Sequence, residues 1–355
     1  MKGLLLAGGH GTRLRPLTYT GNKHLLPIAN KPMLLYGLDH LRNAGIKETV
    51  VILGPIKEGV REVLGNGSKF GMEITYIDQP KPLGLAHAVQ ISKDFMGREP
   101  FVMYLGDNLL RQGVQDFVAS FERTKADCVI GVCPVAEPSR YGIAELEGGR
   151  VKRLVEKPKN SKSNLALIGV YVFGPSIFKA VDAIKPSRRN ELEITDAIQY
   201  LASKGKRVEV EHVKGWWKDT GKPEDLLEAN QLVLADVQSD IAGALSGGTV
   251  VTGNLSMGAG SKTIGHVSIR GPSIIGKNCT IGPNVFIGPY TSIGDGSKLR
   301  NVEIENSIIM NDCEIESRRR ISDSLIGNGS TVADGERRIP KGYKLILGER
   351  SFVQV

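Results

Sequence analysis

The sequence predicts an α/β protein in which a mostly parallel, Rossmann-like sheet is followed by a parallel β-helix. Strand-like and helix-like segments alternate up to about residue 238, a pattern that favours a parallel sheet with helices on both faces. From about residue 245, aliphatic residues recur at every sixth position, which is typical of hexapeptide-repeat β-helices. The change of period predicts two domains, residues 1–238 and 239–355.

The elements of the first half follow from local signals. Apolar runs predict strands over residues 2–6, 49–53 and 101–105. A helix is predicted from Pro32 to residue 44, because Gly45 follows its end, and a second helix over residues 85–95. In such sheets ligands bind at the carboxyl ends of the strands. The glycines after the first strand and the Gly106-Asp107-Asn108 turn after the third are therefore expected to share one crevice.

The second half carries a repeat of six residues: Ile269, Ile275, Ile281, Ile287, Ile293 and Leu299. Four glycines directly follow isoleucines of this series, at Gly276, Gly282, Gly288 and Gly294. A helix would not keep one face at this period, whereas a triangular β-helix points the aliphatic residue inward. The spacing loosens to five or six residues at Ile304, Ile309, Ile315, Ile321 and Ile326, and we expect about four or five coils.

Composition restricts the class of protein. The chain has 355 residues, 41% of them hydrophobic and 24% charged, as in ordinary soluble proteins. With no membrane-length apolar run and no signal-peptide pattern, we expect a cytoplasmic protein. Its four cysteines match no zinc or redox spacing and are expected to be free thiols. The net charge of +8 is scattered, apart from Arg318-Arg319-Arg320, which favours phosphate-bearing small molecules over nucleic acid.

A glycine-rich turn follows the first strand, in LLLAGGHGTRLRPLT. It fails the Walker A pattern, because Thr12 and Arg13 follow Gly11, and it fails the dinucleotide pattern, because Leu14 stands where a third glycine is needed. Its N–H groups, with the cations Arg13 and Lys23, suit the oxygens of a triphosphate. The alternative is a tight turn with solvated cations.

Two acidic turns are candidates for a metal site. Asp107 ends a predicted buried strand, and Asp219 follows the only two tryptophans, in Trp216-Trp217-Lys218-Asp219. Mg²⁺ binds carboxylate and phosphate oxygens together, so the two aspartates could hold one ion if they face each other. The alternative for each is a helix cap or turn residue.

Two further segments suit a sugar phosphate and a base. In Val155-Glu156-Lys157-Pro158, the carboxylate could accept sugar hydroxyls and the lysine could bind phosphate, although a surface ion pair is the commoner case. Gln79 could pair with a base edge near Gly84, unless the stretch is only a loop before a helix. The six histidines form no metal spacing, and no serine stands in a nucleophile elbow.

These segments, in this order, resemble the sugar-phosphate nucleotidylyltransferases. The matching pieces include LAGGHGTRLRPLT, NKHLLPIANKPM, QPKPLGLAHA, YLGDN, VEKP, ELEITDA and WKDTG. The chain is most similar to the long glucose-1-phosphate thymidylyltransferases, which carry a left-handed β-helix after the catalytic domain.

The resemblance implies a role for each matching residue. The implied nucleotide-binding residues are Leu6, Gly8, Gly9, Gly11, Gln79 and Gly84. The implied sugar-phosphate residues are Asn108, Gly142, Glu156, Lys157, Leu167, Tyr171 and Glu191. The implied catalytic cations are Arg13, Lys23 and Lys157, and Mg²⁺ would bind Asp107 and Asp219.

The implied reaction joins dTTP and glucose 1-phosphate, giving dTDP-glucose and pyrophosphate. The sugar phosphate attacks the α-phosphorus in line, and since the nucleophile is already an anion, charge neutralisation and alignment would supply the catalysis. The implied partners are these two substrates and further copies of the chain, with no nucleic acid and no membrane.

Alternatives within the class are UTP as the nucleotide and N-acetylglucosamine 1-phosphate as the sugar. Thymine differs from uracil by one methyl group, worth roughly 1–3 kcal/mol in a fitted pocket. His24 stands where the family often has Gln, which bears on base preference. A different class of activity would be acetyl-CoA-dependent acyl transfer in the β-helix, where His266 is the only histidine. A scaffold protein without activity is the last alternative.

Overall fold

The computed structural model describes residues 1–334 and Val353, and the chain divides into two compact units. The first unit comprises residues 1–11, 21–25 and 33–219, and the second comprises residues 12–20, 26–32 and 220–355. Two short N-terminal segments therefore belong to the unit that contains the β-helix. The boundary at residues 238 and 239 stays a prediction, and the last part of the second domain, residues 335–352 and 354–355, lies outside the described residues.

The first unit is built on a nine-stranded sheet with the order β10-β9-β11-β6-β1-β4-β5, in which β8 pairs with β11 and β12. The strands β6, β1, β4 and β5 are parallel to one another, and β11 runs antiparallel to β6. The bounds are β1 Lys2–Ala7, β4 Glu48–Leu53, β5 Glu73–Asp78, β6 Phe101–Leu105, β8 Cys128–Pro134, β9 Gly142–Glu147, β10 Arg150–Glu156, β11 Leu165–Phe173 and β12 Val208–His212. The expected mostly parallel sheet is confirmed.

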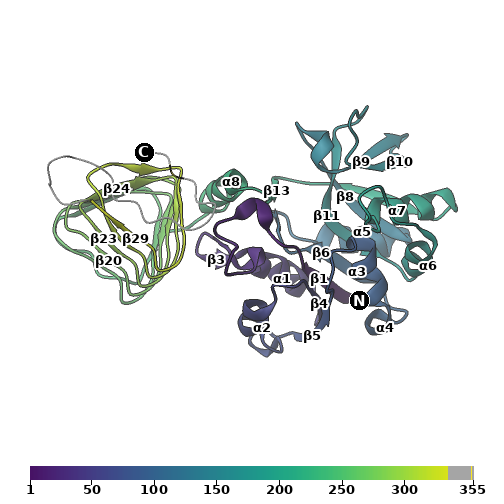
Figure 1. Cartoon of the computed structure of the whole chain (residues 1–355), viewed down its shortest axis with the longest axis horizontal. Coiled ribbons are helices and arrows are strands. Elements are labelled where there is room, and N and C mark those ends of the chain that lie inside the picture. The colour runs from purple at the N-terminus through teal and green to yellow at the C-terminus, as the bar shows by residue number, and fades with distance from the viewer. Residues whose placement is uncertain (335–352, 354–355) are drawn as a thin grey trace. The chain divides into compact units, whose positions relative to one another are not determined.

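Helices cover both faces of this sheet (Figure 1). Buried residues of α1 (Met33–Asn43), α2 (Glu58–Leu64) and α5 (Gln115–Thr124) pack on one face. Those of α3 (Leu85–Ile91), α4 (Lys93–Met96), α6 (Ser176–Ala183) and α7 (Ile194–Ser203) pack on the other. Successive side chains of a strand point to opposite faces, so β1 is apolar from Leu4 to Ala7 because both of its faces are buried there.

One predicted helix is divided in the structure. The segment expected to be helical over residues 85–95 forms α3 and α4, which are separated at Ser92. The Ser92 side chain is buried, and its Oγ donates a hydrogen bond to the carbonyl oxygen of Val89 at 2.7 Å. A serine hydroxyl that bonds to the nearby backbone competes with the helical pattern, which accounts for the break.

The second unit contains a three-sided parallel β-helix. One side is the sheet β14-β16-β19-β22-β25-β28, a second is β15-β18-β21-β24-β27, and the third is β17-β20-β23-β26-β29. The first side comprises Asp240–Ile241, Leu255–Met257, Ser273–Ile275, Thr291–Ile293, Ile308–Ile309 and Leu325–Ile326. The second comprises Thr249–Thr252, Val267–Arg270, Val285–Ile287, Val302–Glu305 and Ile321–Ser322. The third comprises Lys262–Thr263, Thr280–Ile281, Lys298–Arg300, Glu314–Glu316 and Thr331–Ala333.

The six-residue repeat predicted this architecture correctly. The residues from Ile269 to Leu299 fall on six successive strands, β18 to β23, and all six are at most 1% exposed. Their side chains fill the interior of the helix. The strands from β15 to β29 make five coils of three strands, which agrees with the expected number.

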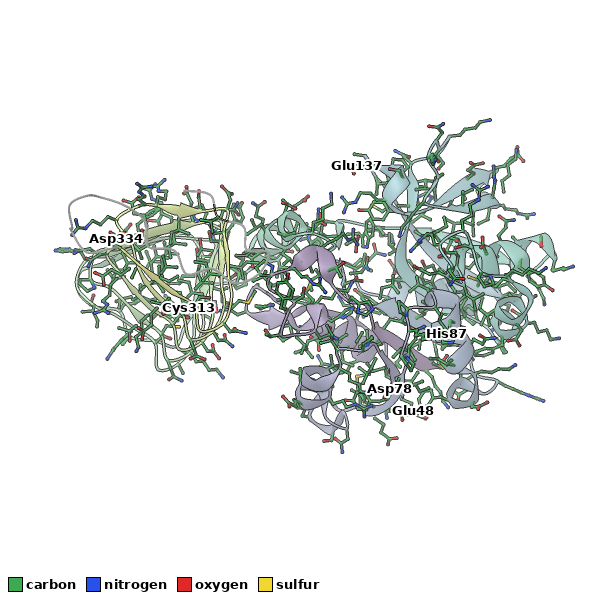
Figure 2. All side chains as sticks on the ribbon, viewed as in Figure 1. Glu48, Asp78, His87, Glu137, Cys313 and Asp334 are labelled. Carbon is green, nitrogen blue, oxygen red and sulfur yellow. The ribbon has the colours of Figure 1, made fainter. Side chains whose placement is uncertain are left out.

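Small polar side chains stack at one corner inside the β-helix. Ser261 Oγ and Ser297 Oγ donate hydrogen bonds to carbonyl oxygens at 2.7 and 3.0 Å. Between and beyond them, Cys279 Sγ and Cys313 Sγ contact the carbonyl oxygens of Gly294 and Gly327 at 3.2 and 3.1 Å; Cys313 is labelled in Figure 2. All four cysteines of the chain are free thiols, and these two occupy serine-like positions.

We therefore expect Cys279→Ser to change the free energy of unfolding by less than about 1 kcal/mol, because the hydroxyl retains the bond to Gly294. Cys279→Val removes the donor and adds volume, and we expect it to cost about 2 kcal/mol. Urea unfolding of both variants measures the difference. Equal destabilisation by Ser and Val would show that the thiol contributes through its sulfur rather than through this bond.

The second unit also holds α8 (Pro223–Leu234), the short helix η1 (Thr12–Leu14) and the hairpin of β2 (Pro27–Ile28) and β3 (Lys31–Pro32). In the first unit, the short helix η2 (Lys23–Leu25) and the strand pair β7 (Asn108–Leu110) and β13 (Trp217–Asp219) lie outside the main sheet. Among the described residues, no helix is both long enough and apolar enough to span a lipid bilayer.

Candidate active site

A pocket of about 200 Å³ lies at the carboxyl ends of β1 and β6 in the first unit. Its lining residues are Leu6, Gly8, Gly9, Lys23, His24, Ile52, Gln79, Pro82, Gly84, Leu85, Leu105, Asp107 and Glu191. The location is the one that strand order predicts for ligands in such a sheet. The structure thus brings together predicted residues from five separate segments of the sequence.

The proposed base-recognition residues are bonded to each other. Gln79 Nε2 donates a hydrogen bond to the carbonyl oxygen of Gly84 at 3.2 Å and lies 2.9 Å from His87 Nδ1. Gly84 has a φ of +99°, and a Cβ there would lie 2.3 Å from the carbonyl oxygen of Leu192. Only glycine allows this approach, which places the loop of Glu191 against the loop of Gln79.

We expect Gly84→Ala to cost at least about 3 kcal/mol of folding free energy, from positive-φ strain and from the clash with Leu192. Gly97→Ala is the matched control, because Gly97 has a φ of +61° and open space around its Cβ position. The control should show the strain alone, about 1 kcal/mol. Urea unfolding gives both values, and equal costs would mean that the backbone of Leu192 does not confine this position.

Lys23 and Asp107 form an ion pair at the floor of the pocket. Asn108 Nδ2 also donates to Asp107 Oδ1 at 3.0 Å, and Trp217 Nε1 donates to Asn108 Oδ1 at 2.7 Å. Burial alone would raise the pKa of Asp107, but the positive charge and hydrogen bond of Lys23 hold that pKa well below its usual range. The carboxylate is therefore ionised and oriented at neutral pH.

Asp219 belongs to the same unit and lies on the strand next to the Asp107 turn. In the antiparallel pair of β13 and β7, Asp219 is opposite Asn108, the neighbour of Asp107. Among residues 1–334 and Val353, no group of three or more His, Cys, Asp or Glu side chains could hold a metal ion by itself. Mg²⁺ commonly takes one or two carboxylates and completes its shell with water and substrate phosphates. Asp107 and Asp219 would provide the two carboxylates for such an ion.

The proposed sugar residues converge around Gly142. A Cβ on Gly142 would lie 2.6 Å from Thr195 Cγ2, 2.9 Å from Leu167 Cδ1 and 3.0 Å from Glu156 Oε2. Any side chain there would occupy the space between these three. Tyr171 is buried, and burial followed by the charge of Glu156 raises the pKa of its hydroxyl, so this tyrosine stays neutral behind the same site.

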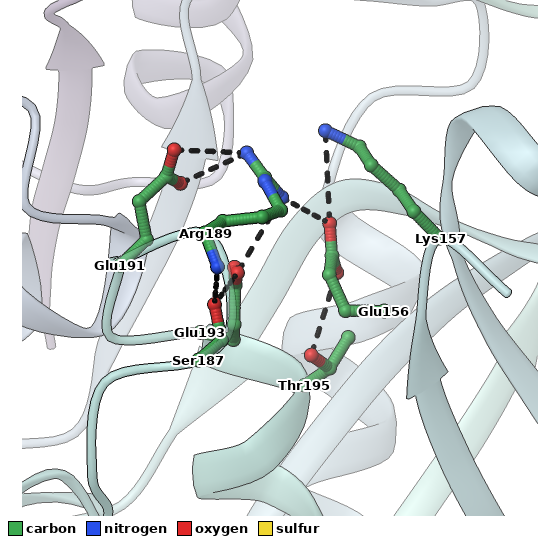
Figure 3. A network of polar contacts seen from close by, with 7 residues as sticks. All are labelled: Glu156, Lys157, Ser187, Arg189, Glu191, Glu193 and Thr195. Atoms are coloured by element: carbon green, nitrogen blue, oxygen red, sulfur yellow. Dashed lines mark hydrogen bonds and ion pairs between the residues drawn. The ribbon is translucent and has the colours of Figure 1, made fainter.

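Arg189 joins the acidic residues of this region, as Figure 3 shows. Its guanidinium donates to Glu156 Oε1 at 3.1 Å and to both carboxylate oxygens of Glu191 at 2.9 and 3.0 Å, and it lies 3.4 Å from Glu193 Oε1. Lys157 Nζ is 3.8 Å from Glu156 Oε1. Burial and the charge of Glu193 raise the pKa of Glu156, against the opposing effect of Lys157 and Arg189.

Arg189 was not among the residues predicted from the sequence. It stands two residues before the ELEITDA segment, in the run Arg189-Asn190-Glu191-Leu192-Glu193. A cation beside two glutamates in a predicted ligand-binding loop was the available signal. Nothing in the linear pattern, however, indicated that Glu156 would be its third carboxylate.

His24 is buried beneath the pocket. Its Nδ1 lies 2.7 Å from Asn22 Oδ1, and Asn22 Nδ2 donates to the carbonyl oxygen of Ala7 at 3.2 Å. Burial, followed by the charge of Lys23, lowers the pKa of His24 to about 3, so the ring is neutral. This neutral pair ties the Lys23 turn to the end of β1.

Arg13 belongs to the second unit, on η1. Its guanidinium nitrogens lie 3.3 Å from the position that a Cβ on Gly221 would take. Gly221 closes the WKDTG segment of the sequence, so two of the segments singled out by sequence meet there.

Comparison with known proteins identifies the family of the chain. Residues 2–236 match the nucleotidyl transferase family model, and residues 263–353 match the GMPPB C-terminal domain. The low-salt glycan biosynthesis nucleotidyltransferase Agl11 of Haloferax volcanii is 47% identical over all of both chains. A glucose-1-phosphate thymidylyltransferase of Streptomyces antibioticus is 44% identical over 100% of this chain and 99% of its own length.

A solved structure shows the same likeness. A putative glucose-1-phosphate thymidylyltransferase of Bacillus anthracis, crystallised with sucrose, superposes with a TM-score of 0.63 at 35% identity, over 68% of this chain and 97% of that one. Sequence and structure thus agree over the whole α/β half, and the full-length relatives extend the agreement through the β-helix. The chain belongs to the nucleotidyl transferase family.

Proposed function

We propose that this protein transfers a thymidylyl group from dTTP to glucose 1-phosphate, releasing pyrophosphate and forming dTDP-glucose. The observation that carries the proposal is the pocket at the ends of β1 and β6, where Lys23 and Asp107 meet and Glu191 forms part of the wall. On one side, such a site offers the cation Lys23 to phosphates and the carboxylate of Asp107 to a metal ion. On the other side, it offers the Arg189 cluster to a sugar phosphate. The full-length relatives support the same substrates.

The nucleotide would bind along the glycine turn. The backbone of Gly8, Gly9 and Gly11 offers N–H groups to phosphate oxygens, and Lys23 and Arg13 supply the positive charge. Gln79 and Gly84 form a bonded edge for the base, where the thymine methyl would be distinguished from uracil. Leu6, which lines the pocket, would border the base.

The sugar phosphate would bind at the Arg189 cluster. Glu156 and Glu191 are acceptors suited to sugar hydroxyls, with Asn108, Gly142, Leu167 and Tyr171 around them. Lys157 and the Arg189 fork are suited to phosphate oxygens. When the sugar phosphate binds, its phosphate oxygens would replace carboxylate oxygens as partners of the Arg189 guanidinium.

Catalysis would consist of alignment and neutralisation. A Mg²⁺ ion held by Asp107 and Asp219 would neutralise charge on the triphosphate. The sugar-phosphate oxygen is already anionic and needs no general base. Arg13, Lys23 and Lys157 would hold the two polyanions in line and stabilise the charge that develops at the α-phosphorus.

We further propose that the protein acts in the cytoplasm as a homo-oligomer. The four free cysteines suit a reducing compartment, and the β-helix provides flat sheet faces for assembly. We assign the β-helix to assembly rather than to acyl transfer, because its single histidine, His266, is exposed in the turn before β18.

The test is release of pyrophosphate from dTTP, UTP, CTP, GTP and ATP, each assayed separately with Mg²⁺ and either glucose 1-phosphate or N-acetylglucosamine 1-phosphate. We expect the highest kcat/KM with dTTP. A higher value with UTP would make the protein a uridylyltransferase. Activity only with N-acetylglucosamine 1-phosphate would change the sugar, and no activity with any sugar phosphate would contradict the proposal.

Lys157→Ala is expected to raise the KM for glucose 1-phosphate at least tenfold, because one charge-assisted phosphate contact is worth about 1.5–3 kcal/mol. The KM for dTTP should remain unchanged. Lys152→Ala is the matched control, since Lys152 is an exposed cation of β10, the strand that ends just before Lys157, and pairs with Glu147 at 2.9 Å. Initial rates at varied sugar phosphate measure the effect, and a changed KM for dTTP alone would move Lys157 to the nucleotide side.

A further inference from the structure

We infer that Asn230 of α8 is a positioning residue for triphosphate binding, because it fastens the segment that follows Lys23 to the β-helix. The inference rests on the proposed role of Lys23 and Arg13. It gives the β-helix a part in substrate binding in addition to assembly. All the contacts involved lie within the second unit, which holds residues 26–32, α8 and the β-helix.

Asn230 is the centre of a buried polar cluster. Its side chain is 1% exposed. Its Oδ1 accepts hydrogen bonds from the backbone N–H of Ala29 at 2.8 Å and from Ser292 Oγ at 2.7 Å, and its Nδ2 donates to the carbonyl oxygen of Tyr290 at 3.0 Å. One amide group thus joins the hairpin of β2 and β3 to the third coil of the β-helix. A buried amide bonded in this way fixes the separation of its partners.

The tip of that hairpin has a strained backbone. Ala29 and Asn30 form its two-residue turn, with φ values of +46° and +60°. Turns of this kind favour Asn and Gly, and alanine is unfavourable in them. The strained Ala29 supplies the N–H that Asn230 accepts, and Asn30 Nδ2 donates to the carbonyl oxygen of Ile293 at 2.6 Å. The surroundings therefore impose the conformation of the turn, as strained backbone requires.

The anchored segments flank Lys23 in the chain, and the first of them carries Arg13. Arg13 lies on residues 12–20, and Lys23 lies on residues 21–25, which connect that segment to residues 26–32. The first anchored segment belongs to the same unit and lies close to the β-helix, since Leu17 Cδ2 is 3.6 Å from the position that a Cβ on Gly327 would take. Both ends of the short stretch that carries Lys23 are therefore held in the second unit, and a displaced hairpin moves the Lys23 backbone by covalent continuity.

The residues proposed for the sugar phosphate lie in a different part of the chain. Gly142, Glu156, Lys157, Arg189 and Glu191 all belong to the continuous stretch 33–219 of the first unit. Loosening the hairpin should therefore weaken binding of the triphosphate and leave binding of the sugar phosphate unchanged. A general loss of folded protein would instead lower the rate without changing either KM.

The experiment compares wild type with Asn230→Ala, Ser292→Ala and Asn30→Gly. Asn30→Gly keeps the positive φ and removes only the bond to Ile293. We measure both KM values, kcat, and the dissociation constant of dTTP by calorimetry without sugar phosphate. For Asn230→Ala we expect the KM and dissociation constant of dTTP to rise about tenfold, with the KM for glucose 1-phosphate unchanged. The two other variants should change in the same direction by less.

Gln231→Ala is the matched control. Gln231 is the next residue of α8, and its Nε2 donates to Asn306 Oδ1 of the β-helix at 2.7 Å. This variant also loses a bond between α8 and the β-helix, but no bond to the hairpin. We expect its dTTP constants to equal those of wild type.

Several results would overturn the inference. These are an unchanged dTTP constant in Asn230→Ala, an equal rise in both KM values, or the same rise in Gln231→Ala. If Asn230→Ala fails to fold, Ser292→Ala and Asn30→Gly decide by the same constants. If wild type binds dTTP without turnover, the proposed function fails and the dissociation constants still decide the inference. A wild type that binds none of the five triphosphates overturns both.

Discussion

Asp107→Asn is expected to lower kcat by about a thousandfold, because it removes an ionised carboxylate that lines the pocket at its phosphate end. Asn keeps the shape of the side chain and its contact with Asn108, but it is a poor ligand for Mg²⁺. Adding Mg²⁺ should restore little activity to the variant. Initial rates at several Mg²⁺ concentrations, with EDTA-treated wild type for comparison, measure the loss.

Removal of one partner from a buried ion pair also destabilises a protein, by about 3–5 kcal/mol. Unfolding in urea must therefore accompany the assay, so that only the folded fraction is counted. Asp78→Asn is the control, since Asp78 (labelled in Figure 2) pairs with Lys57 and Arg61 and is not among the residues that line the pocket. Wild-type kcat in folded Asp107→Asn would remove Asp107 from the metal site and leave Asp219 as the candidate.

Arg189→Ala is expected to have the second-largest effect, a rise of at least tenfold in the KM for glucose 1-phosphate and a loss of about 2 kcal/mol of stability at pH 8. The stability estimate is below that of a fully buried pair because the Arg189 side chain is 39% exposed. Without the guanidinium, the carboxylates of Glu156, Glu191 and Glu193 repel one another.

The stability loss should depend on pH with a definite sign. The pKa of Glu156 is already raised in the folded protein by burial and by Glu193, and removal of Arg189 raises it further. A carboxylate whose folded pKa lies above its unfolded value contributes stability below the unfolded pKa and loses that contribution as pH rises through the folded one. The difference between Arg189→Ala and wild type should therefore be smaller at pH 5 than at pH 8.

Urea unfolding at both pH values checks this dependence. Arg188→Ala is the control, because it removes a neighbouring exposed cation outside the cluster of Figure 3. A pH-independent difference between Arg189→Ala and wild type would mean that Arg189 stabilises the loop by packing rather than by charge.

Much of the fold was predictable because it depends on local periodicity. The apolar run of β1 and the six-residue repeat from Ile269 to Leu299 each indicate which side chains are buried. Burial of those side chains determines where these strands form. The break at Ser92 was not predictable from periodicity, because one hydroxyl bond to Val89 outweighs an otherwise helical pattern. Site residues that follow strand ends, such as Asp107, were predictable for the related reason that parallel strands place their carboxyl ends together.

The remaining parts of the site depend on contacts between distant segments. The role of Arg189 depends on Glu156, which lies at the end of β10, whereas Arg189 lies in the loop before α7, and no spacing rule connects the two. The bond from Asn230 to Ala29 joins residues that are 201 positions apart. The repeat predicted the β-helix, but it carried no information about which N-terminal segments rest on that helix.

The second unit is assembled from three separate segments of the chain. This composition restricts which parts such proteins could exchange by recombination. A crossover near residue 238 would transfer the β-helix without α8 and without residues 12–20 and 26–32, which pack within the same unit. A β-helix from another protein would then have to bond to Asn230 and to the hairpin of β2 and β3, both of which evolved against a different β-helix. A compatible chimaera must therefore carry the hairpin, α8 and the third coil as one inherited set.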